Sequence, residues 1–174
     1  MILIDDYCLG ILYQSYLINE IAAIVMRDWF DLKHLLRTGW VRAGVDSPES
    51  VASHSWGMAI LAMDLCPSDL DKMKVIEMCI VHDLPEAIVG DLTPHDDTSS
   101  KSSDEYAAMM KLAPQWINLL EEYEECLTKE ARFVKYLDKL DMAVMARIYE
   151  DKQGLDLSEF IESAKETIGE TNMV

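Results

Sequence analysis

Four ionisable side chains, far apart in the sequence, fall on stretches that are otherwise apolar and have the spacing of helices: His54, His82, Asp83 and Asp138. An imidazole or a carboxylate is costly to bury unless a partner or a metal ion satisfies it. Two histidines and two aspartates converging from three helices would hold one divalent cation and leave coordination positions open for water and substrate. The chain is therefore expected to fold as helices around one polar centre.

Taken singly, most of these residues have simpler explanations. His54 has Val51 and Met58 as helical neighbours, so it could be a core histidine that donates to a carbonyl group. His82 sits over Met78 in the same way, and Asp83, beside a helix break, could simply cap the turn that follows. The pattern of four residues is thus more informative than any one of them.

Asp138 is harder to explain as a solvated residue. Its helical neighbours Val134 and Met142, at i−4 and i+4, place the carboxylate inside the apolar arc of its helix. A buried aspartate needs a cation or several hydrogen-bond donors. Asp141 also falls within this arc, so periodicity alone cannot choose between the two, and Asp141 could equally pair with a basic residue on a neighbouring helix.

Charge and composition narrow the possible functions. The 174 residues suit one compact domain, and 15 basic against 32 acidic residues give a formal net charge of −17. Such a field repels nucleic acid and anionic membranes, so a role in binding either is disfavoured. A phosphate site would need a metal and a few basic side chains to reverse the sign locally.

The N-terminus and the cysteines favour a soluble cytoplasmic protein. Asp5 and Asp6 stand where a signal peptide would carry basic residues, and the longest early apolar run, 21–26, is too short to cross a bilayer. The four cysteines are scattered and form no CxxC motif, as expected for reduced thiols.

Turn and cap residues predict an all-α fold, with the N-terminal segment 1–18 left without a role. Little in the chain alternates as strands do, and residues 91–103 have the composition of a loop. The first expected helix runs from Asn19 to near Gly39, and the second runs from an N-cap at Ser47, followed by Pro48, to about Cys66. The third begins at a capping box at 68–71 and breaks at Pro85, after which a short turn ends at Gly90. Two helices divided near Pro114 follow, then one from a cap at Thr128 to about Lys152 with Gly154 beyond it, and a last one capped by Ser158.

The order His54, His82-Asp83, Asp138 resembles the H…HD…D pattern of the HD-domain phosphohydrolases. Short sequence segments around these residues resemble those of the 5′-deoxynucleotidase branch of that superfamily, and the likeness spans about residues 32–151. The matching segments are RTGW at 37–40, PESV at 48–51, HS at 54–55, HDLPEA at 82–87, GDLTP at 90–94 and VKYLDK at 134–139. A bare HD dipeptide is a weak signal, whereas this ordered set is specific.

The resemblance implies an HD-domain helical bundle over residues 19–174, usually a homodimer, that removes phosphate from deoxyribonucleoside 5′-monophosphates. It implies one divalent cation (Mn, Co, Fe or Mg) bound by His54, His82, Asp83 and Asp138. By the same likeness Glu86 and Asp91 would be the catalytic carboxylates, Arg37 would meet the phosphate and Trp40 would lie against the base or sugar.

Two departures and several alternatives accompany this interpretation. Ser53 stands where relatives commonly carry Glu or Asp, and the loop 95–103 holds only one basic residue, Lys101. Glu86 could instead stabilise a helix start, and Trp40 could pack in the core or a dimer interface. The rival functions are a phosphodiesterase or nucleoside-triphosphate hydrolase of the same superfamily and a non-catalytic HD module that binds metal or nucleotide.

Overall fold

The computed structural model describes residues 28–170, and its regular structure over that range is helical. The N-terminal segment 1–18, most of the helix expected from Asn19, and Cys8 lie outside the described residues. The elements are α3 (Thr38–Arg42), α4 (Val51–Leu65), α5 (Lys72–Val81), α6 (Glu86–Val89), α7 (Lys101–Leu112), the 3₁₀ turn η1 (Pro114–Trp116), α8 (Ile117–Glu125), α9 (Lys129–Gln153) and α10 (Ser158–Glu170). The predicted all-α fold is confirmed.

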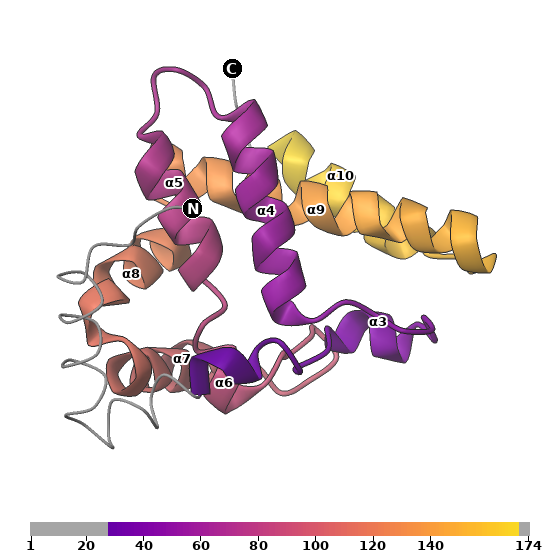
Figure 1. The fold of residues 1–174 in the computed structure, drawn as a ribbon, viewed down its shortest axis with the longest axis horizontal. Coiled ribbons are helices and arrows are strands. Elements are labelled where there is room, and N and C mark those ends of the chain that lie inside the picture. The colour runs from indigo at the N-terminus through magenta and orange to yellow at the C-terminus, as the bar shows by residue number, and fades with distance from the viewer. Residues whose placement is uncertain (1–27, 171–174) are drawn as a thin grey trace, which may run out of the picture.

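Helix α4 packs against α5 and crosses the long α9, while α10 folds back along α9 (Figure 1). The apolar faces of α4, α5, α8 and α9 form one core cluster, in which Met58, Met78 and Leu137 are completely buried. A second cluster, around Trp40, Tyr149 and Leu157, joins α3 to the far end of α9 and to α10. The predicted polar residues therefore come from helices that are held by apolar packing.

Helix ends with clear local chemistry lie where they were predicted. The Thr128 side chain accepts from the backbone N–H of Ala131 at the start of α9, and Gly154, with φ 69°, follows its last residue. The chain breaks before Pro85 and restarts as α6, which ends at Gly90 with φ 83°. His82 and Asp83 are consequently placed at the end of α5, next to the turn that carries Glu86.

Other predicted boundaries are wrong. Helix α4 is capped by Ser50, whose hydroxyl accepts from Ser53 N–H, and not by Ser47, which has a positive φ of 52°. Asp71 caps α5 in place of Ser68, because its side chain accepts from two N–H groups of the first turn. Residues 28–31 are helical and are followed by a turn, so the first predicted helix does not continue to Gly39.

An isolated antiparallel bridge joins Leu36 to Ser50 and explains part of this difference. Ser50 is extended in this bridge, with φ −86° and ψ 162°, and α4 begins directly after it. The backbone N–H of Arg37 donates to the carbonyl oxygen of Glu49, which places Arg37 beside the start of α4. Within residues 28–170 no helix combines the length and the apolar character needed to span a lipid bilayer.

Candidate metal centre and active site

A cavity of about 640 Å³ opens between α3, the loop after α6, and the helices α7 to α10. Of the eight residues predicted for the site, all but His54 line it: Arg37, Trp40, His82, Asp83, Glu86, Asp91 and Asp138. His54 is completely buried behind the wall of the cavity. Residues as far apart in the sequence as Arg37 and Asp138 thus converge at one place.

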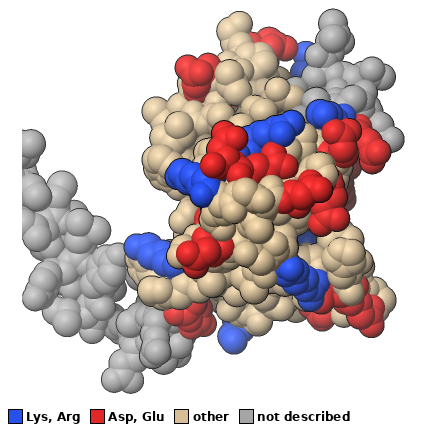
Figure 2. All heavy atoms as spheres, turned by 90° about the vertical axis from the view of Figure 1, so that its right-hand side faces the viewer, with Lys and Arg blue, Asp and Glu red and all other residues tan. Residues whose placement is uncertain are grey.

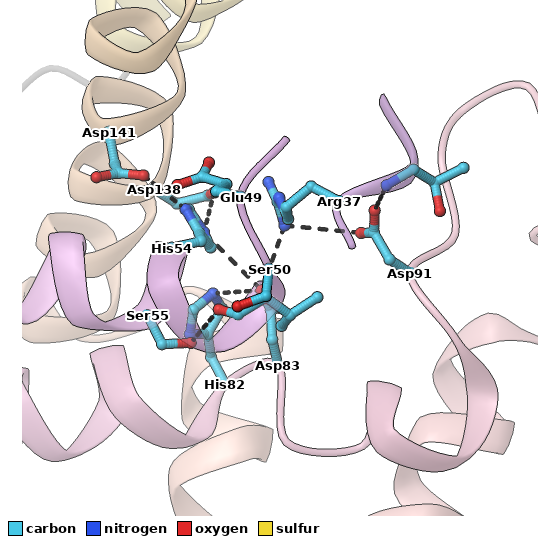
Figure 3. A network of polar contacts seen from close by, with 12 residues as sticks. Arg37, Glu49, Ser50, His54, Ser55, His82, Asp83, Asp91, Asp138 and Asp141 are labelled. Carbon is cyan, nitrogen blue, oxygen red and sulfur yellow. Dashed lines mark hydrogen bonds and ion pairs between the residues drawn. The ribbon is translucent and has the colours of Figure 1, made fainter. Parts of the chain in front are cut away.

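Three of the predicted metal ligands form a compact cluster. His54 from α4, His82 from the end of α5 and Asp138 from α9 each offer a ligand atom, and these atoms lie within 4.8 Å of one another. Asp83 is adjacent, with its Oδ2 3.2 Å from His82 Nε2 and 3.9 Å from His54 Nε2 (Figure 3). Their spacing is short enough for one ion to reach all of them.

Each imidazole ring holds Nδ1 in a hydrogen bond or close polar contact and turns Nε2 toward the carboxylates of the cluster. His82 Nδ1 donates to the carbonyl oxygen of Cys79 at 3.0 Å, and His54 Nδ1 lies 2.7 Å from Oδ2 of Asp141. His54 Nε2 lies 3.3 Å from Asp138 Oδ1 and has no hydrogen-bond partner. In a neutral imidazole that donates through Nδ1, Nε2 carries the lone pair that binds metals.

The donor set therefore fits a divalent cation. Among the described residues, His54 Nε2 and Glu86 Oε2 are the buried side-chain polar atoms that lack a hydrogen-bond partner. Buried polar atoms are normally satisfied, and an ion with its bound water would satisfy both kinds of atom here. Imidazole nitrogens and carboxylate oxygens are common ligands of divalent metal ions in proteins.

Arg37 balances the carboxylates at the mouth of the cluster. Its Nη1 lies 3.4 Å from Asp83 Oδ2 and 3.6 Å from Asp91 Oδ1. Burial lowers the pKa of Arg37, but Asp83, Asp138 and Asp91 raise it further, so the net shift is upward. Arg37 thus remains a fixed positive charge at the edge of the cavity.

The carboxylates respond to this setting in opposite directions. Burial raises the pKa of Asp83, but His82, Arg37 and His54 outweigh it and hold that pKa well below the usual range. Burial, followed by the charges of Asp83 and Asp91, raises the pKa of Glu86 to about 10. Divergent pKa values among neighbouring acids are typical of catalytic sites.

Asp91 and Trp40 have structural contacts in addition to lining the cavity. Asp91 accepts a hydrogen bond from the backbone N–H of Thr38 at the start of α3. Trp40 is only 2% exposed, donates to Glu49 Oε1 at 3.0 Å, and has its ring centroid 4.5 Å from that of Phe160. A substrate contact of Trp40 would have to be made by the ring edge that borders the cavity.

Other basic residues that line the cavity had not been predicted: Arg42, Lys135 and Lys139. Arg42 binds Asp96 through two nitrogens, at 2.6 and 3.0 Å, and so ties the loop after α6 to α3. Lys139 Nζ lies 3.1 Å from Asp138 Oδ2. Helical spacing could have indicated the two lysines, because positions 135 and 139 share with Asp138 one face of α9.

Comparisons with known proteins agree with this arrangement. The sequence matches the family model described as the HD domain over residues 30–173. It is 42% identical over 137 residues to 5′-deoxynucleotidase HDDC2 of Dictyostelium discoideum, which covers 68% of this chain and 72% of that protein. It is 37% identical over 150 residues to 5′-deoxynucleotidase hdd1 of Schizosaccharomyces pombe, covering 77% and 76%.

Solved structures show the same fold. A protein from Pyrococcus horikoshii superposes with a TM-score of 0.78 at 34% identity and covers 86% of this chain and 92% of its own. A conserved hypothetical protein from Pyrococcus furiosus gives a TM-score of 0.75 at 34% identity, with 87% and 99% covered.

Proposed function

Because this chain belongs to the HD-domain family of metal-dependent phosphohydrolases, we propose that it is a 5′-deoxynucleotidase. The proposed reaction releases inorganic phosphate from deoxyribonucleoside 5′-monophosphates. The observation that carries the proposal is the convergence of His54, His82 and Asp138 beside Arg37 and Glu86 at one cavity. The curated relatives named above bear the same activity in their names.

The proposed ligands are His54, His82, Asp83 and Asp138, whose ring nitrogens and carboxylate oxygens lie close together. A cation held there would lower the pKa of bound water toward neutrality and neutralise a phosphoryl oxygen. Four protein ligands of mixed type leave octahedral positions free, which suits Mn²⁺, Co²⁺, Fe²⁺ or Mg²⁺ better than a closed tetrahedral zinc site.

The proposed roles of the remaining residues follow from their positions. Glu86, buried and with one oxygen unpartnered, would orient the attacking water. The positive charge of the cation would lower the pKa of Glu86 from about 10, so that its carboxylate could accept the proton of that water. The guanidinium of Arg37, which contacts Asp83 and Asp91 here, would also bind the phosphate. Two of its N–H groups can donate in parallel to two phosphate oxygens. Asp91 would keep Arg37 and the start of α3 in place beside the substrate.

Basic side chains around the cavity offset the acidic character of the chain. Over the face drawn in Figure 2, acidic and basic side chains are interspersed. At the cavity, Arg37 is joined by four further basic residues, Arg42, Lys101, Lys135 and Lys139. These charges and the proposed cation would make the site attractive to a small phosphate ester despite a formal net charge of −17.

The decisive experiment is a substrate panel. Metal-stripped protein, reloaded with Mn²⁺, Co²⁺, Fe²⁺ or Mg²⁺ in turn, is expected to release phosphate from deoxyribonucleoside monophosphates. A sugar pocket that excludes a hydroxyl through apolar contacts alone discriminates by about 10²-fold, so some ribonucleotide activity is expected as well. Di- and triphosphates and phosphodiesters serve as the comparison substrates.

Three outcomes would contradict the proposal in different ways. Equal rates on both sugars would leave a phosphomonoesterase without the deoxynucleotidase specificity. Hydrolysis only of triphosphates or phosphodiesters would transfer the chain to the rival enzyme classes of the superfamily. Cation binding without turnover of any substrate would identify a non-catalytic module.

We also propose a cytoplasmic homodimer. Helix α4 exposes Trp56, Ile60 and Met63 at i, i+4 and i+7, with Trp56 68% exposed, which is an apolar stripe on one side of the helix. Cys66, Cys79 and Cys126 are unpaired thiols, as is usual in the cytoplasm.

A dimer is expected in light scattering at micromolar protein concentration. Replacing Ile60, in the middle of the stripe, with Lys is expected to shift the protein toward monomer, because a charge would then be buried in the interface. A wild-type protein that is monomeric under these conditions would contradict the dimer.

A further inference from the structure

We propose that Asp141 is a positioning residue for the metal centre and that the absence of a side chain at Gly57 leaves the space for its carboxylate. Asp141 would hold the His54 imidazole so that Nε2 faces the cation, while Asp138, one helical turn earlier, would bind the cation itself. The inference rests on the metal site proposed above and assigns a role to two residues outside it.

The contact between Asp141 and His54 is short and buried. Asp141 Oδ2 lies 2.7 Å from His54 Nδ1, whereas Asp138 Oδ1 faces the other ring nitrogen, Nε2, at 3.3 Å (Figure 3). Asp141 is only 6% exposed. A carboxylate on one nitrogen fixes the proton there and leaves the lone pair on the other nitrogen. The same contact also prevents the ring from rotating within the core.

Glu49 is the other acidic group near this side of the ring, but it is engaged elsewhere. Its Oε1 accepts from Trp40 Nε1 at 3.0 Å, whereas its backbone N–H donates to the Tyr149 hydroxyl. Glu49, His54 and Asp141 also lie close enough together to hold an ion of their own. The distance of 2.7 Å is that of a hydrogen bond, and a nitrogen that carries a proton cannot bind a metal at the same time.

Gly57 supplies the second observation. It lies in the interior of α4, where glycine is disfavoured relative to alanine. A Cβ at this position would overlap Oδ1 of Asp141 and stand 3.2 Å from its Cγ. The Asp141 carboxylate therefore occupies the volume that a side chain at position 57 would fill. This contact lies where α4 and α9 cross.

The pair predicts a non-additive effect on metal affinity. Asp141→Ala removes the hydrogen bond, and Gly57→Ala displaces the carboxylate that makes it, so each is expected to weaken Mn²⁺ binding about 10- to 100-fold. In the double variant the added methyl group has no carboxylate to meet. Its affinity is expected to equal that of Asp141→Ala alone, which is the behaviour of two residues that act through one contact.

The experiment titrates Mn²⁺ into chelator-stripped protein by calorimetry for the wild type, both single variants and the double variant. Asp141→Asn, which keeps an acceptor for Nδ1–H, is expected to retain more affinity than Asp141→Ala. Asp151→Ala, on the exposed side of α9, is the matched control and is expected to leave the affinity unchanged. The melting temperature of each metal-free variant reports whether it has folded.

The outcomes separate this inference from the proposed function. A wild-type protein that binds no Mn²⁺ would overturn the metal site itself. Normal affinity in Asp141→Ala, additive losses in the double variant, or an Asn variant as weak as Ala would overturn the positioning role alone. Binding of two ions, one of them lost in Asp141→Ala, would show that Asp141 is a ligand and would equally overturn it.

Discussion

Glu86→Gln is expected to slow phosphate release from deoxyribonucleoside monophosphates at least about a hundredfold while the cation stays bound. General-base assistance contributes about 10²–10⁴ to a rate, and glutamine cannot take a proton. Glutamine also keeps the size of the side chain and one acceptor, so the packing around this buried position, 4% exposed, is preserved. Steady-state kinetics, together with Mn²⁺ affinity measured on the same preparation, would give both quantities.

Glu77→Gln, a similar charge change on the exposed side of α5, is the control and is expected to have the rate of the wild type. A loss much smaller than a hundredfold in Glu86→Gln would assign Glu86 a structural role at the start of α6. Loss of the cation together with the rate would instead make Glu86 part of the ligand set. Measuring kcat and Kd for the metal separately distinguishes these results.

The parts of the fold that could be predicted are those decided by local chemistry. Thr128 and Gly154 delimit α9 because a hydroxyl cap and a left-handed glycine act on their own helix. The break at Pro85 follows from a proline that cannot donate to the preceding turn. The predicted cap at Ser47 is wrong because Ser50, which is extended in its bridge to Leu36, caps α4 three residues later.

In the candidate site too, the sequence pattern predicts burial, whereas the partner of each residue depends on contacts between distant segments. Apolar periodicity indicated that Asp138 and Asp141 are buried, and both are. It could not distinguish them, because each contacts a different nitrogen of the same imidazole and that choice depends on how α4 crosses α9. The partner of Asp141 is His54 on the neighbouring helix α4, which agrees with the predicted pairing to a basic residue on a neighbouring helix. Likewise, the position of Arg37 beside Asp83 depends on how the chain approaches α4.

Asp138→Ala is expected to abolish metal-dependent activity and to make the melting temperature insensitive to chelator. In the wild type, an ion that binds only the folded state adds about 2.7 kcal/mol to the free energy of unfolding at a hundred times its Kd. For a domain of this size that corresponds to about 5–10 °C in melting temperature. Removing a carboxylate ligand should eliminate most of this stabilisation, because the remaining donors bind the ion more weakly.

The comparison of chelated and metal-loaded protein isolates the metal from other effects of the substitution. Asp138 also contacts Lys139 at 3.1 Å, so the variant loses an ion pair whether or not metal is present. That loss shifts both melting curves of Asp138→Ala equally, whereas the metal contribution appears only as the difference between them. Asp151→Ala, exposed on the same helix, should keep the full wild-type difference. A wild type whose melting temperature is the same with and without chelator would contradict a cation that stabilises the fold, and with it the role of Asp138 as a ligand.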